Sequence, residues 1–404
     1  MTRRSPARLQ GARGFTLVEL LVSVLLAAVV LMSIYFVFIN NARQYYLQEQ
    51  VVQMQESVRF AVEFVKNDLR NAGRNTIISG DPNSWNNPEA NLFCRPEEGI
   101  SAVRLFDDDA NAPGFLNEDE PFNPDRLRLL RDASSGNPLK TQSINGNQVV
   151  VAAADQQSTI TGRAIMNSAA RFESMFVPGR YLLIHTLQAN PPMIDLVPIT
   201  AVQFNGAGLP ATITLANNDA LSTGPCIQDV LCTGDCTVNP IEVVEYALQA
   251  DPDLPRKSDL VRRELTVQGG DLAVRDGSTL VIADYVVNLQ FWGHYDTRAP
   301  GSLTPSFPAD DDLTDDVGNW LEDEEEAMNL RTHRLRGIHM LLAARTPRED
   351  NQFTLGIANQ KMADRNWFNV QVGGGAQDTL ARVATLSSVV ETPNIVKSYS
   401  WGAP

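Results

Sequence analysis

The sequence has little of what most enzymes use for catalysis. It contains no G-x-S-x-G or H-E-x-x-H motif, and its longest glycine run, residues 373–375, lacks the Lys and Ser/Thr of a phosphate-binding loop. Only four of its 404 residues are histidines: His185, His294, His333 and His339. His185 and His339 lie within apolar runs and His294 lies near the end of one, so we expect structural roles for these three. The sequence therefore predicts a protein that is not an enzyme.

Basic residues are also scarce. The 33 Lys and Arg residues are outnumbered by 48 Asp and Glu residues, and the formal net charge is −15. A protein with general affinity for nucleic acid needs a basic surface, because the phosphate backbone dominates that affinity. An acidic surface is typical of a soluble, self-repelling domain. We therefore expect no nucleic acid among the partners.

Cysteines are few, and three of them lie close together. The chain has Cys94, Cys226, Cys232 and Cys236. The spacing of the last three fits no common zinc motif, and no histidine is near them. We expect one local disulfide among these three and a second that links the remaining cysteine to Cys94, as suits an oxidising compartment. Four cysteines allow three connectivities, so the pairing stays open.

Two short acidic runs are candidates for calcium binding, because calcium prefers oxygen ligands. The candidate ligands are Asp107, Asp109, Asp310 and Asp312. Neither run has the twelve-residue pattern of a calcium loop, with its central Gly and terminal Glu. Solvated loops are the favoured interpretation, and we expect no other metal or cofactor.

One long hydrophobic run, residues 15–39, lies near the start of the chain. It is long enough to span a membrane, which takes about 20 apolar residues. Its only charged residue is Glu19, and an acidic side chain within a bilayer costs about 2.5–3.5 kcal/mol, so it needs a partner. Four arginines precede the run, which predicts that this flank stays in the cytoplasm: Arg3, Arg4, Arg8 and Arg13. A simple membrane anchor whose Glu19 has no specific partner is the alternative.

The stretch Arg13-Gly14-Phe15-Thr16-Leu17-Val18-Glu19 resembles the processing signal of the type IV pilin and pseudopilin family. The resemblance implies that a prepilin peptidase cuts between Gly14 and Phe15 and that the new amine of Phe15 is methylated. It also implies that Glu19 accepts the amine of a neighbouring subunit during docking. The protein would lie in the inner membrane, with its head outside the cytoplasm, before it joins a fibre at the cell surface.

The helical period continues beyond the run, and β-like runs follow it. Apolar residues recur every three or four positions up to Ala72, and Gly73 is placed as a helix C-cap. The predicted fold is α+β, with a long N-terminal helix packed on a large antiparallel β-rich head. The expected parts are a leader (1–14), a helix (15–74, of which 15–39 is transmembrane), an elaborated β-rich lobe (75–240) and a pilin-like sheet (241–404). We expect strands at 127–130, 149–153, 181–184, 199–204, 211–215, 241–248, 260–267, 280–287, 286–292, 337–344 and 381–390.

Two further segments resemble narrower groups of this family. Residues 59–73 resemble the helix end of PilW-type minor pilins and of J-type secretion pseudopilins, and Asp284-Tyr285-Val286 resembles the sheet region of PilW-like proteins. The resemblance implies a minor pilin that helps prime a type IV pilus and sits in a tip or sub-tip complex, with roles in motility and adhesion. Its partners would be other minor pilins, the major pilin, the prepilin peptidase and a large tip adhesin. A J-type pseudopilin of type II secretion and a surface binding protein that never polymerises remain alternatives.

Overall fold

The computed structural model describes most of the chain, in segments: residues 16–76, 101–106, 115–116, 121–122, 124–134, 138–186, 194–216, 236–254, 257–295, 335–347, 369–372, 379–393 and 395. The chain divides into two compact units, Met1–Gln53 and Met54–Pro404. One helix, α1 (Leu17–Asn71), contributes residues to both units. The layout is α+β, as predicted: one long, initially apolar helix followed by a large antiparallel β-rich domain.

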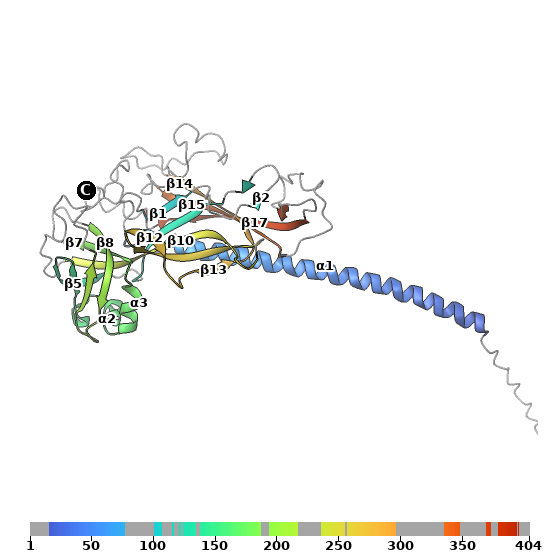
Figure 1. Ribbon diagram of the computed structural model, residues 1–404, viewed down its shortest axis with the longest axis horizontal. Coiled ribbons are helices and arrows are strands. Elements are labelled where there is room, and N and C mark those ends of the chain that lie inside the picture. The colour runs from blue at the N-terminus through green and yellow to red at the C-terminus, as the bar shows by residue number, and fades with distance from the viewer. Residues whose placement is uncertain are drawn as a thin grey trace, which may run out of the picture. The chain divides into compact units, whose positions relative to one another are not determined.

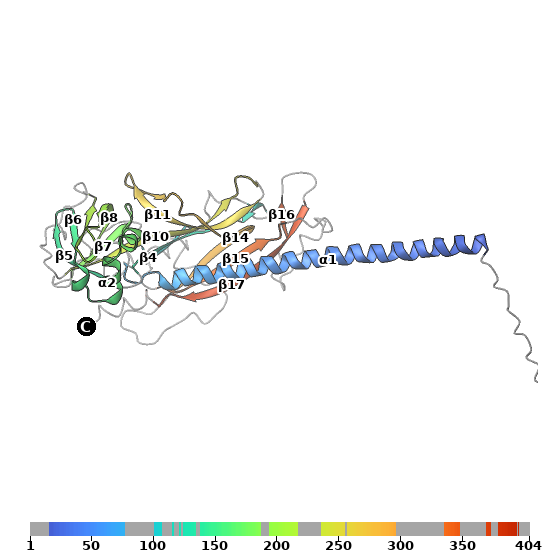
Figure 2. The same ribbon diagram turned by 90° about the horizontal axis from the view of Figure 1, so that it is seen from below.

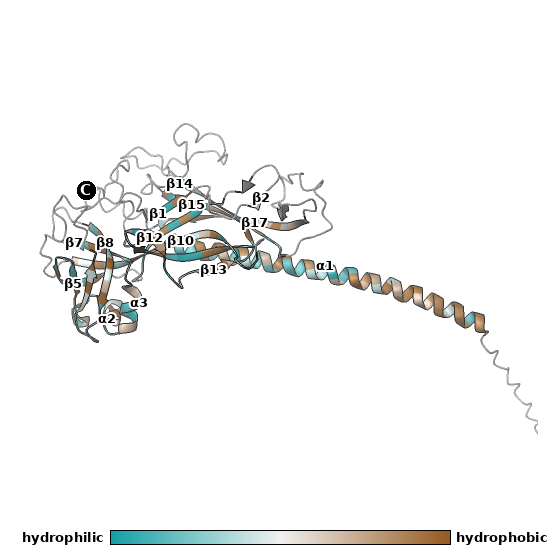
Figure 3. Ribbon diagram, in the orientation of Figure 1, coloured by the Kyte–Doolittle hydropathy of each residue, from teal (hydrophilic) through white to brown (hydrophobic). Residues whose placement is uncertain are grey.

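In the first unit α1 is apolar and exposed. Leu17 is 78% exposed and Phe38 is 69% exposed, and Figure 3 shows hydrophobic colour along this part of the helix. The polar groups within the run are satisfied locally, since the hydroxyls of Ser23 and Ser33 each donate to a carbonyl of their own helix at 2.9 Å. This stretch is long and apolar enough to cross a membrane, where backbone and hydroxyl groups need partners within the chain.

In the second unit α1 becomes amphipathic. Its buried face carries one apolar stripe: Met54, Val58, Ala61, Val62, Val65, Leu69 and Ala72. The helix then ends where predicted, because Gly73 adopts the left-handed conformation, with φ +74°. The Gly73 N–H donates to the carbonyl of Leu130 at 3.3 Å, so the end of α1 is bonded to strand β4 (Arg126–Asp132).

The first sheet of the second unit is centred on one long strand, β10 (Cys236–Ala250). Its neighbours are β4 (Arg126–Asp132) and β11 (Ser258–Gln268), both antiparallel to it. The sheet continues through β1 (Val103–Phe106) beyond β4, and through β12 (Asp271–Val274) and β13 (Leu280–Ala283) beyond β11. A separate two-stranded pair consists of β2 (Phe115–Leu116) and β3 (Pro121–Phe122).

The first half of β10 also belongs to a closed barrel. Its strand order is β10–β5–β6–β9–β8–β7 and back to β10. The other strands are β5 (Leu139–Asn145), β6 (Gln148–Val151), β7 (Tyr181–Thr186), β8 (Ile194–Gln203) and β9 (Ala211–Leu215). Between β6 and β7 lie η1 (Ala154–Gln156), α2 (Ile160–Met166) and α3 (Ala169–Met175), beside the green strands of Figure 1. Closure leaves the barrel without a free edge.

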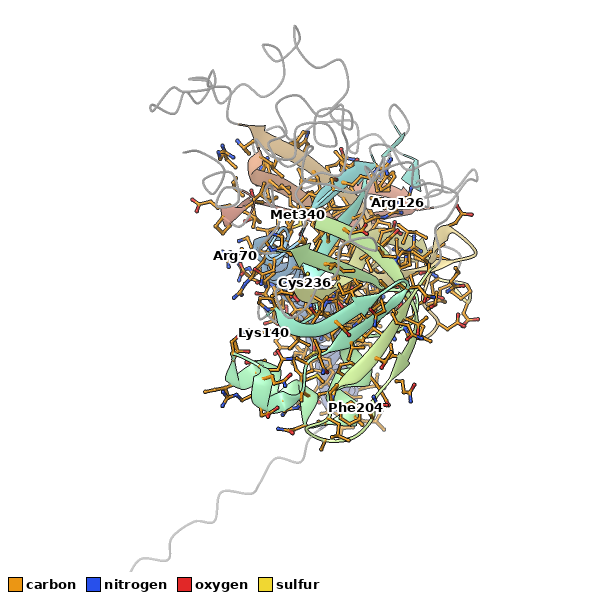
Figure 4. All side chains as sticks on the ribbon, turned by 90° about the vertical axis from the view of Figure 1, so that its left-hand side faces the viewer. Arg70, Arg126, Lys140, Phe204, Cys236 and Met340 are labelled. Carbon is orange, nitrogen blue, oxygen red and sulfur yellow. The ribbon has the colours of Figure 1, made fainter. Side chains whose placement is uncertain are left out.

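A separate core fills the barrel. Phe172 from α3 stacks on Phe176, with ring centroids 4.6 Å apart, and on Phe204, at 5.6 Å. Around them lie buried residues from all of its strands: Leu139, Ile144, Val149, Leu182, Ile184, Val197, Ile213, Leu215 and Val238. In Figure 4, Lys140 and Phe204 mark the barrel, and Cys236 marks the start of the strand that it shares with the first sheet.

The second sheet has four strands in the order β14–β15–β17–β16. They are β14 (Val286–Tyr295), β15 (Leu335–Arg345), β17 (Thr379–Glu391) and β16 (Asn369–Val372), which lie side by side in Figures 1 and 2. In β14, residues 286–289 are all buried, so the clean alternation expected from the sequence is seen only from Leu289 through the half-buried Gln290 to the buried Phe291. Asp125, at the start of β4, bonds to β14 twice: its N–H donates to the Leu289 carbonyl, and its carboxylate accepts the Phe291 N–H, both at 2.7 Å.

The expected boundary at residue 240 differs from the structure. It falls inside β10, and strands β1 and β4, which precede it, pair in the same sheet as β10 and β11. The barrel takes up 138–216 and the first residues of β10, and it contains two helices that the sequence analysis did not predict. Strand pairing sets this division, and pairing between distant segments is not visible in a local hydrophobic pattern.

Asp68 attaches α1 to the first sheet. This residue is 3% exposed and accepts hydrogen bonds from the hydroxyl of Tyr246 at 2.6 Å and from Arg262 Nε at 2.8 Å. Arg131 also donates to it. Burial and the nearby negative charge of Asp68 raise the pKa of Tyr246, so the phenol stays protonated and can donate. Three strands, β4, β10 and β11, therefore hold one helix carboxylate.

The same arginines continue into a larger buried network. Glu242 of β10 forms ion pairs with Arg131, Arg262 and Arg180. Arg180, which precedes β7, also pairs with Glu264, and Arg275 binds that carboxylate at 2.7 Å. Nη1 of Arg180 donates to the carbonyls of Ser174 and Met175 at the end of α3, at 2.9 and 2.8 Å. Because each buried charge has a partner, the cost of desolvating it is offset.

We expect Asp68→Asn to destabilise the second unit by up to about 3–5 kcal/mol, because the half-buried Arg131 and Arg262 lose one of the two carboxylates that they share. The measurement is urea unfolding of the detergent-solubilised full chain, followed by circular dichroism. The matched control is Glu63→Gln on the same helix, whose exposed pair with Lys66 at 3.0 Å should change stability by less than about 1 kcal/mol. Equal losses in the two variants would contradict the anchoring role of Asp68.

Gly73→Ala should also weaken the junction. A Cβ at this position would lie 2.9 Å from Cγ1 of Ile395, and the positive φ strains any other residue. Gly269→Ala is the control, since φ is +65° there but a Cβ meets nothing within 4 Å. We expect a loss of about 1–2 kcal/mol for Gly269→Ala and a larger loss for Gly73→Ala in the same urea experiment. Equal losses of stability in the two variants would show that Ile395 can move away from the added Cβ without destabilising the protein.

Candidate functional site

The candidate site is the start of α1, where Thr16 caps the helix. The Glu19 N–H donates to Thr16 Oγ1 at 3.3 Å, and the Thr16 hydroxyl donates back to the Glu19 carboxylate at 3.4 Å. The Leu20 N–H donates to the Thr16 carbonyl at 3.2 Å. The pattern is a variant of the capping box, in which residues three apart satisfy the free groups of the first turn. It holds the Glu19 carboxylate at the positive end of the helix dipole, which favours an anion.

Glu19 is surrounded by apolar side chains. It is exposed, and so are Leu17, Val18 and Leu20 beside it. No other charged residue occurs between it and Asn40. Its partner within the described part of the chain is Thr16, which is neutral, so the charge itself is not balanced there. In an apolar surrounding this carboxylate requires a cation from elsewhere.

Gly14 and Phe15, the predicted processing residues, lie outside the described residues. Cleavage between them, and methylation of the Phe15 amine, therefore stay predictions. Four residue steps along a helix cover about 6 Å, so an amine at Phe15 would begin roughly one turn from Glu19. Cleavage would place one carboxylate and one amine at the same end of an apolar helix.

In the second unit, the face of α1 opposite its buried stripe carries an aromatic pair. Phe60 is 61% exposed, and its ring centroid lies 6.0 Å from that of Phe64, one turn later. Glu63, which lies between them in the sequence, pairs with Lys66 at 3.0 Å. Exposed aromatic side chains on a helix are costly in water and are typical of surfaces that contact another protein.

The predicted disulfide and calcium residues are mostly outside the described part. Cys236 lies at the start of β10, is 2% exposed and is disulfide-bonded. The other three cysteines lie outside the described residues, so the pairing stays a prediction: Cys94, Cys226 and Cys232. The calcium candidates lie outside them as well: Asp107, Asp109, Asp310 and Asp312. Among the residues that are described, no group of three or more His, Cys, Asp or Glu is arranged to hold a metal ion.

Of the histidines in the described part of the chain, one lies apart and two are neighbours. His185 of β7 lies in the barrel, and burial lowers its pKa. His294 of β14 and His339 of β15 lie on adjacent strands, and their ring centroids are 6.4 Å apart. The structure thus brings together two histidines that the sequence analysis treated singly. Only the strand register, in which Trp292 faces His339, places the two rings on one face.

An arginine cluster was also missed. The guanidinium groups of Arg104, Arg126 and Arg128 lie 4.9, 4.2 and 4.8 Å from the centre of the Phe106 ring. Arg128 binds the buried carboxylate of Glu245 at 2.9 Å. The spacing of Arg126 and Arg128 could have indicated the cluster, because residues two apart in a strand lie on the same face of the sheet.

Comparison with known proteins supports the assignment of the N-terminal region. A family model, described as the prokaryotic N-terminal methylation motif, matches residues 9–35. No curated protein and no solved structure matches the chain. The matched stretch contains Gly14, Phe15 and Glu19 and continues into the exposed apolar part of α1. The motif and this helix together support a type IV pilin-like or pseudopilin protein, anchored in a membrane through its N-terminal helix.

Proposed function

We propose that this protein is a minor pilin that helps prime the assembly of a type IV pilus and sits in its tip or sub-tip complex. The observation that carries the proposal is Glu19, a single carboxylate that Thr16 orients at the start of an exposed apolar helix. The proposed partner of Glu19 is the methylated amine of Phe15 on a neighbouring subunit. Prepilin peptidase creates that amine by cutting after Gly14.

The pairing would place subunits in register. An unpaired carboxylate in the membrane costs about 2.5–3.5 kcal/mol, and the neighbouring amine removes that cost only when it lies within hydrogen-bond reach. A slip of one residue along the helix is about 1.5 Å, and one turn is 5.4 Å, so the wrong register leaves the charge unpaired. The exposed side chains between Leu17 and Phe38 would supply the packing between helices.

The second unit favours a subunit that is present in few copies over one that is repeated along the whole shaft. Behind the helix it contains two sheets and a closed barrel, which a densely repeated subunit would have to accommodate at every step. The exposed Phe60, with Phe64 beside it, would contact neighbouring minor pilins or the major pilin. A large tip adhesin is a further proposed partner, and the acidic composition gives no support to nucleic acid. The protein would wait in the inner membrane and then join the surface fibre.

Replacing Gly14 tests processing. We expect Gly14→Arg to block cleavage, because a residue with a side chain would not fit where the peptidase accepts glycine. Mass spectrometry of the N-terminal peptide from membranes should find N-methyl-Phe15 in the wild type and the uncut leader in the variant. A wild-type peptide that begins at Met1 or Thr2, in cells with an active peptidase, would instead support an anchor that does not polymerise.

Replacing Glu19 tests docking. We expect Glu19→Ala to be cut and methylated normally but to enter fibres at least about tenfold less, since the loss of a pairing worth a few kcal/mol exceeds that factor. Glu56→Ala is the matched control, because it removes an exposed acidic residue from the same helix. The measurement is immunoblotting of sheared fibres against the membrane fraction. Normal incorporation of Glu19→Ala would contradict the docking role.

Deletion of the gene separates the pilus from the secretion system. A minor pilin should be needed for surface fibres, whereas a J-type pseudopilin should be needed for the export of folded proteins. The amount of surface fibre and the amount of exported protein are measured in the same deletion strain. The wild-type gene should restore whichever of the two is lost. Loss of export with normal fibres would overturn the pilus proposal and leave the docking mechanism intact.

A further inference from the structure

The outward face of the second sheet carries two neighbouring histidines. In the register of β14, β15 and β17, Trp292 lies opposite His339, and His294 lies opposite Gly337. Gly337 in turn lies opposite Glu391 of β17. Residues that alternate along a strand share a face, so His294 and His339 are diagonal neighbours on one side of the sheet.

The two imidazoles lie edge to face, and no hydrogen bond joins them to other described residues. Their ring centroids are 6.4 Å apart and their planes are inclined by 66°. Both side chains are half-buried, and Nδ1 of His339 is buried without a hydrogen-bond partner in the described part of the chain. Burial lowers the pKa of His339, and the nearby His294 lowers it further, which favours the neutral form of the His339 imidazole. Neutral imidazoles keep a lone pair that can bind a metal ion.

The surroundings favour a cation. Gly337 has no side chain, so no group from β15 stands between His294 and the exposed carboxylate of Glu391. Among the described residues no third donor is close enough to complete a preformed site. An ion held here would have two protein ligands, with water in its other positions and Glu391 as a nearby negative charge.

We propose that His294 and His339 bind one late first-row divalent ion, of the class Cu²⁺, Zn²⁺ and Ni²⁺. Imidazole suits these ions, whereas Ca²⁺ and Mg²⁺ prefer oxygen ligands. Metal–nitrogen bonds of about 2.0–2.1 Å hold two imidazole centres roughly 5–6 Å apart, slightly less than the separation seen here. Small rotations of the two side chains close the difference. The site is independent of Glu19 and of the docking role proposed above.

Trp292 provides a direct readout. Its ring centroid lies 5.2 Å from that of His339, close enough for a bound Cu²⁺ ion to quench its fluorescence. We expect Cu²⁺ titrated into the untagged, detergent-solubilised full chain to produce saturable quenching with one ion per chain. His294→Gln and His339→Gln should each weaken binding at least tenfold. His185→Gln, in the barrel, should leave it unchanged, and Trp292→Phe should remove most of the quenching while equilibrium dialysis still finds the bound ion.

A second measurement keeps the test valid if a histidine variant folds poorly. Zn²⁺ binds the folded chain of the wild type, so it should raise the melting temperature in a concentration-dependent way, and excess Ca²⁺ or Mg²⁺ should not. Circular dichroism without metal shows which variants are folded. Absence of saturable quenching and of thermal stabilisation in the wild type would overturn the proposal. Equal Cu²⁺ affinity of the folded wild type and a folded His294→Gln or His339→Gln variant would overturn it as well.

Discussion

The buried carboxylate of Asp68 is the interaction on which the head's attachment to its helix depends. A charge that is 3% exposed would be unfavourable on an otherwise apolar helix face, and it is tolerated because Tyr246, Arg262 and Arg131 all donate to it. These donors come from three strands of the first sheet. Apolar packing of the stripe along α1 is non-directional, so the bonds to Asp68 are what determine how the last turns of the helix lie on the sheet.

Two acidic residues of the same helix therefore differ in whether the described part of the chain balances their charge. Asp68 is fully satisfied by the second unit, which makes it an internal anchor. Glu19 is oriented by a neutral hydroxyl and has no cation among the described residues, so its charge is not balanced there. The end of the helix is therefore bonded to its own head, whereas under the proposed function its beginning would dock on another subunit. The exposed apolar residues after Glu19 would pack in the same contact.

The sequence predicted those features that depend on local patterns. The extent of α1, the Gly73 cap and most strands followed from the spacing of apolar residues, and β9 matches its expected bounds, residues 211–215. The division of the head did not follow, because β10 pairs with β4, β5, β7 and β11, and no local pattern encodes which distant strands meet. The partners of Asp68 and the pairing of His294 with His339 depend on the same strand register. Gly14 and Phe15 were predicted from a contiguous motif, and their roles stay predictions because both lie outside the described residues.

Strand β10 makes the barrel and the first sheet mechanically continuous. Its first residues close the barrel, and its later residues pair with the strands that hold Asp68. Arg180 adds a second link, because it bonds the carbonyls at the end of α3 and also the carboxylates of Glu242 and Glu264. Glu242 shares Arg131 and Arg262 with Asp68. A load on the barrel therefore reaches α1 through a covalent strand and through a chain of buried ion pairs. The barrel is therefore attached to the rest of the second unit at more than one point.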